Sequence, residues 1–206
     1  MKDKGKYALG LVLILALAFF AKGIYESRSS PYVSPLPAAP ENPNAVQIIE
    51  YSDFKCPYCG RAAGTVRQLQ DSYGDKIEIT FKHFPLPFHA GSDKAAEASE
   101  CARDQGKFWE YHDRLFSDFT RGVDIGQKNV LKKIGSELGL ETQAFNECID
   151  SNSKKKLVQQ QTSEGKSLGV TGTPTFFIEG EKLVGAQPYE TFVRVIDAKL
   201  KQKQNE

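Results

Sequence analysis

The chain has 206 residues, enough for one folded domain with short appendages. It is 40% hydrophobic and 26% charged, which is typical of a globular protein and excludes a largely disordered chain. The formal net charge is +1, and no cluster of basic residues interleaved with aromatic ones occurs. The sequence therefore predicts no nucleic-acid partner.

The N-terminal segment has the pattern of a membrane-targeting sequence. Lysines at positions 2, 4 and 6 precede an uncharged run from Tyr7 to Ala21, and a basic start before an apolar run is typical of secretion signals. If the Lys22 side chain reaches the membrane surface, the apolar span extends to Tyr25. We expect residues 1–26 to be a signal anchor or a cleaved signal peptide, and the longer span favours an anchor over residues 7–25. Since basic residues precede the span, the rest of the chain is predicted to be extracytoplasmic, on the periplasmic or cell-surface side.

Residues 27–44 are a predicted linker. This segment holds five of the ten prolines and almost no large apolar side chains, so it cannot bury a core of its own. We expect an extended tether here, followed by a single domain over residues 45–206.

The domain begins with a predicted strand, helix and strand. Residues 46–51 are rich in β-formers, and Pro57 suits the first position of a helix. Apolar residues then follow at spacings of three and four up to Gly74, which can end the helix. Residues 77–81 alternate between apolar and polar side chains, as in a strand.

The middle of the domain shows only helical patterns. They run from Ser92 to about Leu168, and we place a helical insertion at about residues 88–168. After Thr173-Pro174 the pattern predicts a strand at 175–178, a hairpin partner at 181–184 and a final helix from Pro188. The predicted order is β-α-β, a helical block, then β-β-α.

The motif Cys56-Pro57-Tyr58-Cys59 predicts a redox centre. A thiolate is the attacking species in disulfide exchange, and backbone N–H groups at a helix N-terminus favour the anion. Cys56 is placed where these groups point, so it is the predicted nucleophile. Cys59 lies one turn further along and is predicted to resolve the mixed disulfide.

The same Cys-x-x-Cys spacing also occurs at zinc and iron–sulfur sites. A second such pair is absent, and Cys101 and Cys148 are far apart in the sequence. We therefore expect no metal and no organic cofactor. A membrane-tethered metal-binding module that uses Cys56 and Cys59 is the alternative from a different functional class.

Four separated motifs resemble the DsbA-type branch of thioredoxin-fold proteins. They are the strand–CPYC–helix opening, residues 81–87 (FKHFPLP), residues 101–109 (CARDQGKFW) and residues 170–176 (VTGTPTF). The resemblance covers residues 45–200 and implies an α/β thioredoxin fold with an all-helical insertion between its β-α-β and β-β-α halves. It also implies that Pro174 is a cis-proline beside the active site and that Thr173 contacts the thiols and the substrate backbone.

The resemblance also implies a function. We expect a protein thiol–disulfide oxidoreductase, specifically a dithiol oxidase that introduces disulfides into exported proteins with free thiols. A membrane redox partner would regenerate the active-site disulfide. The Pro57-Tyr58 dipeptide differs from the Pro-His of the best-known strong oxidant of the family, so a reductase or isomerase is the alternative. Isomerases of this kind usually carry a dimerisation module, which this sequence lacks, and a monomer is expected.

Glu50 is a candidate for proton transfer. It lies six residues before Cys56, where thioredoxin-fold proteins carry a buried acid. Burial would raise the pKa of the carboxyl group, which could then accept the Cys59 proton during exchange. The alternative is a carboxylate on an edge strand that faces water.

Cys101 and Cys148 form the second cysteine pair. Four cysteines allow three pairings, and the redox motif leaves Cys101–Cys148 as the partner pair. We predict a structural disulfide between two helices of the insertion, and family members often carry such a pair. Two inert thiols or a second redox relay are the alternatives.

Overall fold

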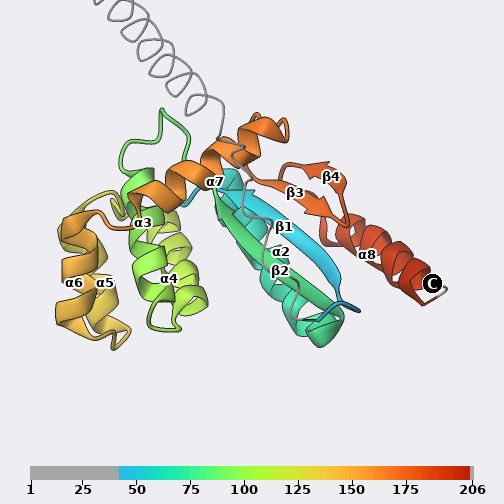
Figure 1. Cartoon of the computed structure of the whole chain (residues 1–206), viewed down its shortest axis with the longest axis horizontal. Helices are drawn as coiled ribbons and strands as arrows, with labels where there is room; N and C mark the ends of the chain where they lie inside the picture. Colours follow the sequence, from blue (N-terminus) through green and yellow to red (C-terminus); the bar gives the residue numbers. More distant parts are fainter. Residues whose placement is uncertain (1–41, 205–206) are drawn as a thin grey trace, which may run out of the picture. The chain divides into compact units, whose positions relative to one another are not determined.

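The computed structural model describes residues 42–204, and a four-stranded mixed sheet forms their centre (Figure 1). The strand order is β2-β1-β3-β4. The central strand β1 (Val46–Ser52) pairs in parallel with β2 (Ile77–His83) and antiparallel with β3 (Thr175–Ile178). Strand β4 (Glu181–Val184) pairs antiparallel with β3 and forms the other edge.

Helices α2 (Pro57–Tyr73) and α8 (Tyr189–Lys203) contribute to a core on one face of the sheet. Alternate residues of β1 point to this face, because successive side chains of a strand point to opposite sides. The short helix η1 (Gly74–Lys76) connects α2 to β2. The buried members of this core are Val46, Ile48, Ala62, Val66, Leu69, Ile77, Phe176, Ile178, Phe192 and Ile196.

A close contact fixes helix α7 (Lys155–Ser167) to the carboxyl ends of β1 and β2. A Cβ atom at Gly165 would lie 2.8 Å from the Phe84 ring and 2.9 Å from the Tyr51 ring, so glycine is needed there. Helix α7 therefore packs on the sheet as well as on α3, although the sequence pattern places residues 155–167 within the helical insertion.

Four further helices form a separate layer beside the sheet (Figure 1). They are α3 (Ser92–Arg103), α4 (Phe108–Thr120), α5 (Lys128–Glu137) and α6 (Thr142–Ser151). Their buried aromatic and aliphatic side chains join Phe54, Cys56, Cys59 and Phe81 in one continuous core. The insertion is thus packed directly against the segment that carries the CPYC motif.

This architecture confirms the predicted α/β thioredoxin fold with helices inserted between β-α-β and β-β-α halves. Among the helices of residues 42–204, none has the length and apolar character needed to cross a membrane. The anchor predicted for residues 7–25 and most of the predicted linker lie outside the described residues.

Candidate active site

The CPYC motif lies at the junction of β1 and α2. Cys56 is the N-cap residue of α2, with extended backbone angles of φ −89° and ψ 121°, and Pro57 occupies the first helical position. Proline fits there because its missing N–H would have no helical partner. The free N–H groups of the first turn point toward Cys56, as the sequence predicted.

The Thr173-Pro174 segment lies beside Cys56. The Sγ atom of Cys56 donates a hydrogen bond of 3.4 Å to the Thr173 carbonyl oxygen, and the Thr173–Pro174 peptide bond is cis. The N–H of Gly185, just after β4, donates to the Pro174 carbonyl oxygen at 2.8 Å. The fold therefore brings together groups that are 117 residues apart in the sequence.

The two active-site thiols have opposite electrostatic environments. The pKa of Cys56 is lowered to about 5, mainly because the Cys59 thiol donates a hydrogen bond to it. The Thr173 side chain and the backbone N–H groups of Cys59 and Tyr58 lower the pKa further, while burial opposes this change. The pKa of Cys59 is raised, because the side chain is fully buried and adjoins the Cys56 charge. Both cysteines are free thiols, so the structure is that of the dithiol form.

The two middle residues of the motif, Pro57 and Tyr58, are exposed. The Tyr58 side chain is 56% exposed, whereas Cys56 and Cys59 are 3% and 0% exposed. The Arg61 guanidinium lies 4.4 Å from the centre of the Tyr58 ring, a cation–π distance. A protein partner that approaches Cys56 would therefore meet this tyrosine–arginine pair.

Glu50 is buried on the central strand, so it cannot be the edge-strand carboxylate that faces water. It is 1% exposed, and β1 is bordered by β2 and β3. Because alternate side chains of a strand point to the same face of the sheet, Glu50 lies on the face of Ile48 and Ser52, beneath α2. Burial raises the pKa of Glu50 to about 7, and the nearby Ser52 hydroxyl opposes this rise. Such a group can gain or lose a proton near neutral pH.

Asp53 is a buried residue of the site that the sequence patterns did not reveal. Its side chain is completely buried, and it is hydrogen bonded to Lys55 in the active-site turn and to Leu86 and His89 in the loop after β2. In the sequence it is one aspartate in a turn, and this gives no sign of burial.

Cys101 and Cys148 are joined by a disulfide between α3 and α6. The S–S distance is 1.98 Å and the Cα atoms are 5.9 Å apart. The alternative of two free thiols is therefore wrong for this pair.

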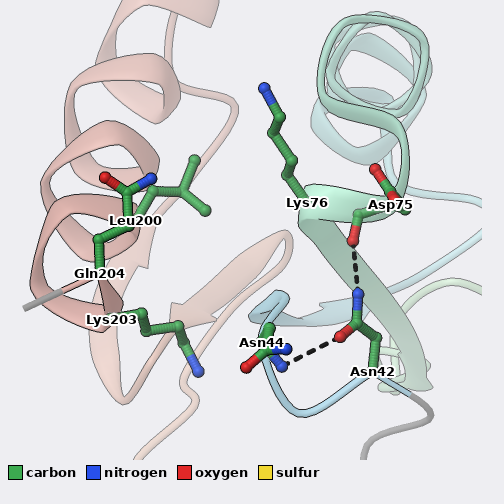
Figure 2. Close-up of a pocket in the computed structure, with 7 residues that line it drawn as sticks. All are labelled: Asn42, Asn44, Asp75, Lys76, Leu200, Lys203 and Gln204. Atoms are coloured by element: carbon green, nitrogen blue, oxygen red, sulfur yellow. Dashed lines mark hydrogen bonds between the residues drawn. The ribbon is translucent and has the colours of Figure 1, made fainter. Parts of the chain in front are cut away.

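A pocket of about 540 Å³ lies at the opposite end of the sheet, where β1 and β2 begin (Figure 2). Polar side chains line most of it, and Asn42 donates a hydrogen bond of 2.9 Å to the Asp75 carbonyl oxygen. None of the cysteines contributes to it. Within residues 42–204, no group of three or more His, Cys, Asp or Glu side chains is arranged to hold a metal ion.

The family comparison agrees with this geometry. A family model described as thioredoxin matches residues 41–198. Among solved structures, a thioredoxin-like oxidoreductase from Silicibacter pomeroyi is 28% identical, with a TM-score of 0.68 over 82% of this chain and 96% of that chain. A single-substitution variant of α-DsbA1 from Wolbachia pipientis is 25% identical, with a TM-score of 0.70 over 82% of this chain and 94% of that one.

Curated relatives are much longer proteins. A Na⁺/H⁺ antiporter NhaA of Herminiimonas arsenicoxydans is 34% identical over 151 residues, which are 73% of this chain and 23% of that protein. An antiporter NhaA 3 of Salinispora tropica is 36% identical over 70% of this chain and 21% of its own length. The chain thus spans less than a quarter of the length of these relatives, and the antiporter activity in their names belongs to the longer proteins. Because the family model covers residues 41–198, the chain belongs to the thioredoxin family, and it shares its fold with solved DsbA-type structures.

Proposed function

We propose that this enzyme is a dithiol oxidase that transfers its Cys56–Cys59 disulfide to reduced cysteines of exported proteins. The contrast between the two thiols supports this most strongly. A low pKa of Cys56 means that the reduced enzyme holds a stabilised thiolate, and stabilising the reduced form makes the disulfide more oxidising. A reductase such as thioredoxin stabilises its thiolate less and keeps the pKa of its nucleophilic cysteine at about 7.

The reaction consists of two exchange steps. A substrate thiolate attacks Sγ of Cys56, forms a mixed disulfide with it and releases Cys59 as a thiolate. A second substrate thiolate then attacks the substrate sulfur of the mixed disulfide and releases Cys56. The substrate has lost two electrons and gained a disulfide, and the enzyme has accepted these electrons and become a dithiol.

Glu50 is proposed to supply the proton that Cys59 needs. The raised pKa of Cys59 makes its thiolate a poor leaving group unless a proton reaches it, and a buried acid with a pKa of about 7 is suited to deliver one. In the reverse direction the same carboxylate accepts the proton. Thr173 and Pro174 are proposed to offer backbone to an extended substrate beside Cys56.

The location and the partners are also proposals. The basic and apolar N-terminal pattern supports an extracytoplasmic domain, anchored by residues 7–25. Because each turnover leaves the enzyme as a dithiol, an electron acceptor must regenerate the disulfide, and a membrane redox partner fits an anchored enzyme. We propose that the enzyme acts as a monomer.

An oxidation assay tests this function. Oxidised enzyme is mixed with a reduced, unfolded protein that contains two cysteines, and substrate disulfides are counted by mass after alkylation. We expect one substrate disulfide to form for each enzyme disulfide that is lost. The proposal is wrong if enzyme disulfides persist while the substrate stays reduced.

The same assay with Glu50→Gln tests the proton transfer. We expect the variant to react more slowly below pH 7, by about 100-fold or more, because general acid–base catalysis contributes roughly 10²–10⁴-fold. Protonated Glu50 is lost as the pH rises through about 7, so the wild-type advantage should shrink above that value. A ratio of the two rates that does not change with pH would contradict the role of Glu50.

A further inference from the structure

The Asp53 carboxylate is buried and fully hydrogen bonded. Its Oδ1 atom accepts the backbone N–H of Lys55 at 2.8 Å and the Ser92 hydroxyl. Its Oδ2 atom accepts the backbone N–H of Leu86 at 2.8 Å and lies 2.7 Å from Nδ1 of His89. A buried carboxylate is tolerated only with such partners, so these groups are held in one arrangement around it.

These bonds join two segments of the chain. One is the turn that carries the nucleophile, in which the Cys56 N–H donates to the Asp53 carbonyl oxygen at 3.0 Å. The other is the loop between β2 and α3, residues 84–91. The Lys55 ammonium also donates to the Ala90 carbonyl oxygen of this loop at 2.7 Å. The loop is therefore hydrogen bonded to the turn at both Asp53 and Lys55.

The fastened loop carries the most exposed large apolar side chain among the described residues. Phe88 is 76% exposed, and its ring contacts the His89 ring edge-on, with centroids 4.6 Å apart. The His89 ring is in turn hydrogen bonded to the Asp53 carboxylate. The position of the Phe88 ring therefore depends on a carboxylate three residues before Cys56. An exposed aromatic ring with a fixed position is suited to bind an apolar side chain of a partner.

We propose that Asp53 is a positioning residue for disulfide exchange, which holds the Phe88 loop beside the Cys56 turn so that an apolar polypeptide meets the nucleophile and the aromatic ring together. This inference rests on the proposed exchange function and adds to it a class of substrate: cysteines flanked by large apolar residues. A small thiol such as glutathione needs only the sulfur atom and would not depend on Phe88.

The test compares two thiols that reduce the oxidised enzyme. One is glutathione and the other is a peptide with a single cysteine between leucine and phenylalanine. Asp53→Asn keeps the volume, but its NH₂ group must face one of the two backbone N–H donors, Lys55 or Leu86, so the junction is broken. We expect Asp53→Asn and Phe88→Ser each to lower the peptide rate constant about tenfold and the glutathione rate constant less than about twofold. The double variant should be no slower than either single variant, because both changes remove one shared contact.

Two further variants complete the design. His89→Ala removes the hydrogen bond between the loop and the carboxylate, while Asp53 keeps its two backbone N–H donors. This variant replaces Asp53→Asn in the test if Asp53→Asn does not fold. Asp124→Asn is the matched control: it removes an exposed carboxylate 2.9 Å from the Lys55 ammonium and should leave both rate constants unchanged. Equal losses with peptide and glutathione, additive losses in the double variant, or wild-type peptide rates in folded Asp53→Asn would each overturn the inference. A wild-type enzyme that reacts with neither thiol would overturn the proposed function and this inference with it.

Discussion

Replacing Cys56 with Ala should abolish disulfide exchange, with a loss on the order of a thousandfold or more, whereas replacing Cys59 with Ala should trap substrates on Cys56. The structure gives the physical reason. Cys56 holds the stabilised thiolate at the start of α2, and Cys59 is fully buried with a raised pKa. When the reduced enzyme meets a substrate disulfide, attack therefore occurs at residue 56, and residue 59 is needed only to release the mixed disulfide.

The measurement is a nonreducing gel of each reduced variant after incubation with a protein that has a disulfide bond, because the Cys56 thiolate forms a mixed disulfide only by attacking a disulfide. Cys59→Ala should show adducts that disappear on reduction, and Cys56→Ala should show none. The double variant Cys56→Ala/Cys59→Ala is the control for adducts that form through Cys101 or Cys148. Equal adducts from both single variants would mean that the attacking residue is wrongly assigned.

Removing the disulfide of the insertion should lower stability by about 2–4 kcal/mol and leave exchange intact. The bond closes a loop between residues separated by 47 positions, for which the chain-entropy model gives about 4 kcal/mol. The double variant Cys101→Ala/Cys148→Ala avoids leaving a reactive free thiol. Urea unfolding of the wild type and the double variant, both with the Cys56–Cys59 pair oxidised, measures the difference.

The activity of the same double variant separates a structural bridge from a redox relay. At a temperature where the variant remains folded by circular dichroism, the glutathione exchange rate should match that of the wild type. A folded variant that has lost exchange would mean that electrons pass through Cys101 and Cys148, and the bridge would then have a catalytic role.

The sequence predicted the elements that depend on local patterns. Pro57 and the apolar spacing in residues 59–73 specified α2, and the alternation in residues 77–81 specified β2. The strand–CPYC–helix order then placed Cys56 at a helix N-terminus without any tertiary information. The position of Thr173 beside Cys56 came from the family resemblance, because nothing local links residues 117 positions apart.

The parts that escaped prediction depend on tertiary contacts. Residues 155–167 have a weak amphipathic pattern, so only the structure shows that Gly165 brings α7 onto Tyr51 and Phe84. Asp53 escaped for the same reason. Its donors at Leu86, His89 and Ser92 lie more than 30 residues along the chain, and an isolated aspartate in a turn normally faces water.

The equilibrium between the Cys56–Cys59 pair and glutathione tests the central claim most directly. The enzyme is equilibrated in glutathione buffers of known ratio, quenched with acid and alkylated, and the fraction of dithiol is read by mass. The stabilised Cys56 thiolate predicts a reduction potential between about −120 mV and −200 mV, on the oxidising side of the range for thioredoxin-fold enzymes. A potential near −270 mV, roughly the value of a thioredoxin, would contradict the account and make the enzyme a reductase.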